Sequence, residues 1–397
     1  MKRPPRVVSW VVVIIAALLF IGPMLVGFYT DWKWFGAIEY RGVFTKTLIA
    51  RIVLFVVFGL VAAAISYVAG MLVWRGRGSS LDMADLNSPV YQYRQSIERT
   101  MGVFLKTIPV LVGVVSGLLG QANWRTVMLF LNSHDFGVED PQFHHDLGFY
   151  AFQLPVWSML VNAFSMLFAV CFIIALVGHY ILGGIRIGNR AAGVRGAVSK
   201  PARTQLVVTA GIWMLLQVAG YWLERYQLLY SEHSLFTGGS YTDINAYLPA
   251  KIILMIIGVF VAVAIFSALV IKDLRIPGLA VVLMVVSSLV IGQGWPLIME
   301  RFSVNPNRQA KEAESISRNI ESTRFAYGLG DDKVTYENNW GEGEVSDDKV
   351  ASDSSTISNL RLLDPDILAP TFTQMQQLKN FYGFPETLAM DRYQICL

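Results

Sequence analysis

Long, uninterrupted apolar runs occupy the first three quarters of the chain, separated by short polar connections. A bilayer core about 30 Å thick requires about 20 apolar residues in a helix. Such runs must be helical, because lipid cannot hydrogen-bond a free backbone N–H or C=O group, and they lack the alternation of β-barrel strands. They predict an all-α polytopic membrane domain over residues 1–299, with seven transmembrane helices at 7–29, 48–74, 101–120, 157–182, 205–223, 252–271 and 278–299.

The pattern changes after residue 299, where polar positions dominate. Residues 305–329 carry apolar side chains at helical spacing and predict an amphipathic helix. A polar, acidic loop is expected at 330–358. Apolar positions within 357–363 predict a short strand before an Asp-Pro turn, and 370–384 predicts a helix. We therefore expect residues 300–397 to be the start of a mixed α/β extracytoplasmic domain.

Composition supports a membrane protein. The chain has 397 residues, of which 54% are hydrophobic and 15% charged, with a mean hydropathy of +0.47. Soluble domains carry roughly 25% charged residues, so a soluble enzyme, a disordered chain and a fibrous protein are excluded. Two cysteines, Cys171 and Cys396, exclude a disulfide-rich scaffold.

The distribution of charge predicts the orientation. Residues 1–299 carry 22 Lys and Arg against 13 Asp and Glu, whereas residues 300–397 carry 10 against 16. With the N-terminus inside, the inner connections hold more than twice as many Lys and Arg as the outer ones, as the positive-inside rule requires. We expect a multi-pass protein of the cell membrane with a cytoplasmic N-terminus, and seven spans place the acidic tail outside.

Four long and specific stretches stand out along the chain: FGVEDPQFHHDLGFYAFQLP (136–155), RNIESTRFAYGL (318–329), TISNLRLLDPDIL (356–368) and FTQMQQLKNFYGFPETLAMDRY (372–393). In these stretches the chain resembles Uncharacterised Protein Family 0182. The resemblance covers nearly the whole chain and implies a bacterial membrane protein with seven spans and a large extracytoplasmic domain. It implies no activity and maps no catalytic residue. Because the family pattern continues past the final QICL, we expect the outer domain to be cut short.

A cluster of histidines and carboxylates in the second outer connection is a candidate metal site. Imidazole and carboxylate ligands suit Zn²⁺ and similar ions. Their spacing matches no zinc signature, so a hydrogen-bonded loop is the favoured interpretation. The candidate ligands are His134, Asp140, His144 and His145.

The connection between the fourth and fifth spans is strongly basic and contains no acidic residue between positions 186 and 203. Such a loop determines topology and also attracts anionic headgroups at about 1 kcal/mol per cation. Nucleic acid is not expected as a partner, because no folded basic domain is present. The candidate contacts with anionic lipid are Arg186, Arg190, Arg195, Lys200 and Arg203.

Polar and small residues within the spans predict helix packing. We expect His179 to be packed and hydrogen-bonded, and Gln205 and Gln217 to bond between helices. Three glycines of the third span, at helical spacing, are expected to pack against another helix of the same chain in preference to a homodimer partner. They are Gly113, Gly117 and Gly120.

Three functions are open at this point. A scaffold, assembly or partner-binding protein of the cell envelope is favoured, because no expected span carries a central Asp or Glu for ion coupling. The second is a transporter or lipid-handling subunit, which requires a groove near the third span. The third is a metal-dependent membrane enzyme that uses the outer histidine cluster. No motif implies a cofactor, and homo-oligomers or envelope proteins are the expected partners.

Overall fold

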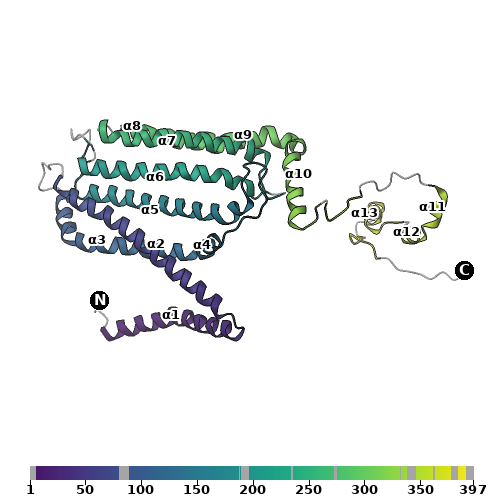
Figure 1. Ribbon diagram of the computed structural model, residues 1–397, viewed down its shortest axis with the longest axis horizontal. Helices are drawn as coiled ribbons and strands as arrows, with labels where there is room; N and C mark the ends of the chain where they lie inside the picture. Colours follow the sequence, from purple (N-terminus) through teal and green to yellow (C-terminus); the bar gives the residue numbers. More distant parts are fainter. Residues whose placement is uncertain are drawn as a thin grey trace. The chain divides into compact units, whose positions relative to one another are not determined.

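A computed structural model describes residues 6–79, 89–186, 188, 196–233, 236–271, 275–330, 332–337, 346–360, 363–376 and 383–389. The chain is mainly helical (Figure 1). The α-helices are α1 (Arg6–Ala37), α2 (Arg41–Arg75), α3 (Pro89–Ala122), α4 (Trp124–Leu131), α5 (Leu154–Ile181), α6 (Lys200–Gln227), α7 (Leu248–Ile271), α8 (Arg275–Leu289), α9 (Trp295–Met299), α10 (Arg308–Ala326), α11 (Asp347–Ser352), α12 (Ser354–Asn359) and α13 (Pro365–Met375).

Short segments of other structure join these helices. The π-helical segments are η2 (Phe149–Gln153), η4 (Asp243–Tyr247), η5 (Val290–Gly294) and η6 (Glu300–Val304). The 3-10 helices are η1 (Gly76–Ser79), η3 (Leu228–Tyr230) and η7 (Asn305–Asn307). In the described residues, the strands β1 (Ile185–Arg186) and β2 (Ala197–Val198) form one antiparallel pair, with Ile185 opposite Val198.

Six helical segments are long and apolar enough to cross a membrane, within the described part of the chain. They match the second to seventh expected spans, which are thereby confirmed as helices of spanning length. The first expected span, 7–29, lies in the continuous helix α1. Between 11% and 33% of each spanning window is buried inside the molecule. Phe260 is 70% exposed, Val270 81% and Leu279 70%, so the outer surface is apolar, as lipid requires.

The spans pack in an order close to that of the sequence. Helix α2 packs against α3 and α5, α5 against α6, α6 against α7, and α7 against α8 (Figure 1). Buried side chains of α6, α7 and α8, such as Met214, Leu254 and Met284, form one core cluster. A second cluster joins Ala62 and Ala69 of α2 to Leu167 and Cys171 of α5. The core of the bundle therefore consists of separate clusters, each of which joins neighbouring helices.

The glycines of the third span lie against α2. A Cβ on Gly113 would meet the Gly59 carbonyl oxygen at 2.8 Å and the Ala63 Cβ at 2.9 Å, and one on Gly117 would meet the Phe55 carbonyl oxygen at 2.7 Å. This close approach needs residues without a side chain. The prediction of packing within the chain is confirmed, and this face of α3 is filled by α2.

The prediction of a strand within 357–363 is wrong for residues 357–360, and residues 361 and 362 lie outside the described residues. Among the described residues of 324–397 the structure has helices and no strand. The carboxylate of Asp353 accepts a hydrogen bond from the Thr356 N–H at 3.1 Å and caps α12, which contains Ile357. Asp364 caps α13 in the same way, with Pro365 at its first position. A short apolar run without a partner strand cannot satisfy its backbone in extended form, and Asp-Pro begins a helix as readily as a turn.

The rest of this segment differs in part from expectation. A helix is confirmed within 305–329 as α10. Its apolar positions Ile316 and Ile320 are 39% and 46% exposed, however, and the buried side chain is that of Glu312. The loop expected at 330–358 contains α11 and most of α12, and the helix expected at 370–384 begins earlier, as α13. The chain forms two compact units, Met1–Thr323 and Arg324–Leu397. A mixed α/β domain after residue 299 is therefore not supported.

Candidate functional site

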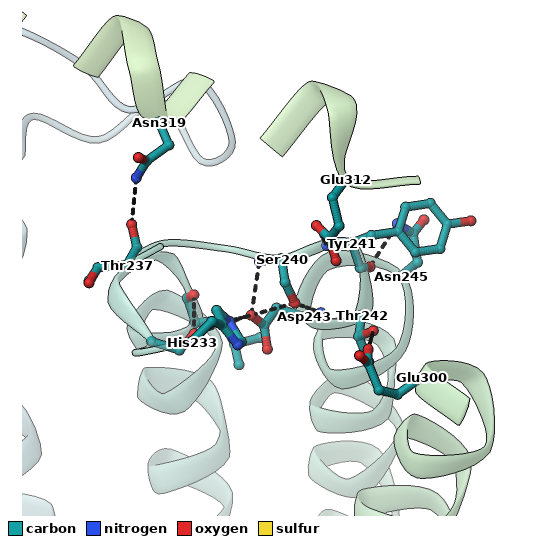
Figure 2. A network of polar contacts seen from close by, with 12 residues as sticks. His233, Thr237, Ser240, Tyr241, Thr242, Asp243, Asn245, Glu300, Glu312 and Asn319 are labelled. Atoms are coloured by element: carbon teal, nitrogen blue, oxygen red, sulfur yellow. Dashed lines mark hydrogen bonds and ion pairs between the residues drawn. The ribbon is translucent and has the colours of Figure 1, made fainter. Parts of the chain in front are cut away.

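A network of polar contacts surrounds the start of the helical run that leads into α7 (Figure 2). We call this end of the bundle, where α6 ends and α10 begins, the α10 end. Ser240 and Asp243 cap the run reciprocally: the Ser240 N–H donates to Asp243 Oδ2 at 2.9 Å, and the Asp243 N–H donates to Ser240 Oγ at 3.1 Å. This is a capping box, and it fixes the first turn of the helix.

Asp243 is the centre of this network. Its Oδ2 also lies 2.6 Å from His233 Nε2, and the hydroxyls of Ser231 and Ser240 donate to it at 3.2 and 2.9 Å. The residue is 3% exposed. Several donors at one carboxylate oxygen compensate for its burial. Asp243 therefore ties the connection between α6 and α7 to the helix start.

Two further carboxylates reach the same helix start from the segment after α9. Glu312 Oε2, on α10, accepts the Tyr241 N–H at 2.9 Å, and Glu300, in η6, accepts hydrogen bonds from the Thr242 hydroxyl and the Arg308 guanidinium. The N-terminal end of a helix carries a positive partial charge that favours such carboxylates. We call Asp243, Glu300 and Glu312 the carboxylate cluster.

Helix α10 is held to the bundle at more than one point. Figure 2 shows Glu312 and Asn319 reaching from α10 to the segment before α7. The Asn319 side-chain amide donates to the Thr237 carbonyl oxygen at 2.7 Å. Lys311 Nζ donates to the Tyr241 hydroxyl at 3.1 Å and lies 4.7 Å from the centre of that ring. We call the contacts of Glu312, Asn319 and Lys311 the α10 latch.

A cavity of about 580 Å³ opens beside this network. Its walls combine charged and apolar side chains. The charged residues that line it are His233, Asp243, Glu300, Arg301, Arg308 and Glu312. Its size is within the range of small-molecule sites, ~300–1,000 Å³. The π-helical segments η4 and η6 contribute to the wall, and such segments are frequent at functional sites.

Sequence reasoning missed this site. The Ser240-x-x-Asp243 pattern before an apolar run was the one local signal, because it is a capping motif. Glu312 and Tyr241 are 71 residues apart in sequence. No periodicity or motif could have brought them together.

The candidate metal ligands of the second outer connection are separated by the loop's own contacts. Asp140 is 4% exposed and accepts hydrogen bonds from the N–H groups of Gln142, Phe143 and His145 and from the Tyr150 hydroxyl, at 2.6 to 2.9 Å. Burial raises the pKa of Asp140, but these bonds together hold it below its ordinary value. The carboxylate organises the loop.

The histidines near Asp140 have different surroundings. His134 lies between the rings of Phe136 and Phe152, with centroids 5.3 and 5.2 Å away. His145 lies 5.3 Å from the Tyr226 ring, and His144 is exposed with a positive φ of 58°. In the described residues no group of three or more His, Cys, Asp or Glu side chains could hold a metal ion. The geometry offers the metal hypothesis no support.

The basic connection is described in part. Arg186 lies in β1, Lys200 is exposed at the start of α6, and Arg203 follows one turn later. Arg190 and Arg195 lie outside the described residues. Contact of this loop with anionic lipid stays a prediction.

Of the two glutamines expected to bond between helices, Gln205 does so, whereas no such bond of Gln217 is seen among the described residues. His179 is 1% exposed, and its Nε2 lies 2.9 Å from Gln205 Oε1. The Gln205 amide donates to the Ala69 carbonyl oxygen at 2.8 Å. One glutamine thus joins α2, α5 and α6, and His179 has a structural role.

Comparison with known proteins gives the family. The profile of the Uncharacterised protein family (UPF0182) matches residues 8–396. UPF0182 proteins from Corynebacterium glutamicum and Rhodococcus erythropolis are 60% and 47% identical, over 394 and 396 residues. Each match covers 99% of this chain and 40% of the relative, so the chain spans about two fifths of the length of these curated relatives. No solved structure matches it. The chain belongs to the Uncharacterised protein family UPF0182, and its helices identify it as a helical membrane protein.

Proposed function

We propose that this chain is the membrane-embedded part of a scaffold or partner-binding protein of the cell envelope. In this proposal the spans lie in the plasma membrane, the N-terminus is cytoplasmic, and the segment after α10 is extracytoplasmic. The excess of Lys and Arg in the inner connections supports this orientation. Its partners are envelope proteins or a second copy, and the basic connection meets anionic lipid on the cytoplasmic face.

The α10 latch is the observation that carries the proposal. A helix that merely followed the last span would need no buried contact with the bundle. Here Glu312 is 2% exposed and bonds to a backbone N–H of the α7 start, and Asn319 bonds to the Thr237 carbonyl oxygen. The bundle thereby fixes the direction in which the chain leaves the membrane, which is what presentation of a following segment requires.

The segment after the latch offers surface for a partner. Leu360, Ile367 and Met375 are 68%, 70% and 71% exposed. Apolar side chains left exposed in this way favour contact with another molecule. The spans offer no central acidic residue for ion coupling, and α2 fills the glycine face of α3, where a transport groove was expected. These features favour binding over transport.

The test uses the chain in its native membrane. A Glu312→Ala, Asn319→Ala double variant removes two of the three contacts of the α10 latch and leaves that of Lys311. It is expected to destabilise the docked α10 by about 2–4 kcal/mol, since one of the two lost hydrogen bonds is to a buried charge. Cross-linking in intact cells, followed by size analysis of the tagged chain, is expected to show a discrete complex with the unchanged protein. The double variant is expected to lose that complex.

The control is Arg318→Ala, on the same helix, because in the described part of the chain Arg318 pairs with the exposed Glu314 one turn away and not with the bundle. It should retain the complex. The proposal is contradicted if the unchanged chain forms no cross-linked complex in its native membrane. It is also contradicted if the double variant retains the complex.

A further inference from the structure

Two charged groups that line the cavity of the α10 end have no ionic partner among the described residues. They are Glu312 and Arg301. The other lining carboxylates have side-chain partners, since Asp243 Oδ2 lies 2.6 Å from His233 Nε2 and Glu300 pairs with Arg308. The cavity therefore presents one unmatched negative group and one unmatched positive group to the same space.

The free-energy cost of burying the Glu312 carboxylate is only partly offset by its contacts. It is 2% exposed, and the hydrogen bond that it accepts in the described part of the chain comes from the neutral N–H of Tyr241. The N-terminal end of the helix offsets only about half a charge, and the carboxylate cluster shares that end. A buried carboxylate without a cationic partner is unfavourable. A ligand that brings a cation to Glu312 would remove this cost.

The cavity also borders the apolar surface that faces lipid. Leu297 lines the cavity and is 62% exposed, and Ile298 and Phe302, close to it in sequence, are 57% and 72% exposed. In a bilayer these side chains lie at the end of a span, where acyl chains meet headgroups. The cavity wall therefore includes an apolar side chain that is exposed at this end of the bundle.

We propose that this cavity binds the headgroup of a phospholipid that carries a primary ammonium. The phosphate pairs with Arg301, because a guanidinium matches phosphate oxygens in a bidentate way. The ammonium donates hydrogen bonds to Glu312, and the acyl chains follow the apolar surface past Leu297. A quaternary ammonium has no N–H to donate, and a purely anionic headgroup brings no cation to Glu312.

The experiment measures which lipid stays bound. The chain is purified, reconstituted in nanodiscs with equal amounts of phosphatidylethanolamine, phosphatidylcholine and phosphatidylglycerol, and released for native mass spectrometry. Phosphatidylethanolamine is expected to be enriched in the retained lipid. Arg301→Gln and Glu312→Gln are each expected to reduce its retention about tenfold, as the loss of one charged hydrogen bond implies. Arg301→Gln leaves the α10 latch intact. The control is Arg318→Gln on α10, which is expected to leave the retention of phosphatidylethanolamine unchanged.

Other outcomes would overturn the proposal. Enrichment of phosphatidylglycerol would show that Arg301 attracts lipid without a contribution from Glu312, and equal retention of all three lipids would show no recognition of the headgroup. Unchanged retention in Arg301→Gln would place the lipid elsewhere. Competition by soluble phosphoethanolamine at the same concentration as the lipid would show that the ligand comes from solution.

Discussion

Individual carboxylates in this chain act mainly on the backbone around them. Asp140 and Asp146 lie six positions apart in the second outer connection, and both accept several backbone N–H bonds. These bonds hold the pKa of each below its ordinary value, for Asp146 chiefly through the Phe136 N–H and for Asp140 in spite of its burial. A residue type typical of metal sites thus serves here to fold a loop.

Asp140→Asn is expected to loosen this loop. The amide cannot accept as many strong bonds as the carboxylate, and the loss of charged hydrogen bonds at a buried group costs about 1–3 kcal/mol. Hydrogen exchange of residues 134–148 should become faster in the variant. Asp135→Asn is the control, because Asp135 is exposed and its carboxylate makes no hydrogen bond in the described part of the chain. Equal protection in both variants would contradict this role.

The same bonds predict the pH dependence of the loop. A carboxylate whose pKa is lowered on folding stabilises the fold above its unfolded pKa, and this stabilisation disappears as the pH falls through the folded value. Protection of residues 134–148, corrected for intrinsic exchange, should be constant near neutral pH. It should decline below the ordinary value of 3.8, and in Asp140→Asn that decline should be smaller.

At the scale of helices, close packing of α2 and α3 depends on glycine. In an exposed helix, replacing Gly by Ala stabilises by about 1 kcal/mol. At Gly113 the sign should reverse, because the new Cβ would meet the Gly59 carbonyl oxygen at 2.8 Å and push the helices apart. Gly113→Ala should destabilise the detergent-solubilised chain by about 1–3 kcal/mol, measured by denaturant titration.

The matched control is on the same helix. Nothing lies within 4 Å of a Cβ built on Gly102. Gly102→Ala should therefore leave the stability unchanged or raise it. If both variants behave alike, the contact between α2 and α3 does not require glycine.

The helices that could be predicted from the sequence are those that the lipid bilayer requires. Lipid demands a helix from every long apolar run, so the second to seventh spans followed from hydropathy alone. After residue 323 that constraint ends. There the side chains of Asp353 and Asp364 cap α12 and α13 and so favour helices. The prediction of a strand from the short apolar run did not take these caps into account. The carboxylate cluster depends on contacts between distant segments, which the sequence pattern does not encode.

At the scale of the bundle, the usual arrangement of a soluble protein is reversed. Apolar side chains lie on its surface, and the polar network described above lies at the α10 end. Exposed side chains such as Phe260 and Leu279 account for its surface, and only a small share of each spanning window is buried inside the molecule. Such a surface suits a bilayer. The side on which each end of the bundle lies is a separate question, and it stays a prediction from the charge of the connections.

Single-cysteine labelling tests that orientation. In a background with Cys171→Ser and Cys396→Ser, Ser358→Cys and Lys200→Cys each place one thiol at an exposed position. The excess of Lys and Arg places Lys200 inside, so an impermeant maleimide should label Lys200→Cys only after permeabilisation. Ser358→Cys should be labelled on intact cells, because an odd number of spans separates it from the cytoplasmic N-terminus. The reverse pattern would invert the orientation, and labelling of both on intact cells would contradict the number of crossings between them.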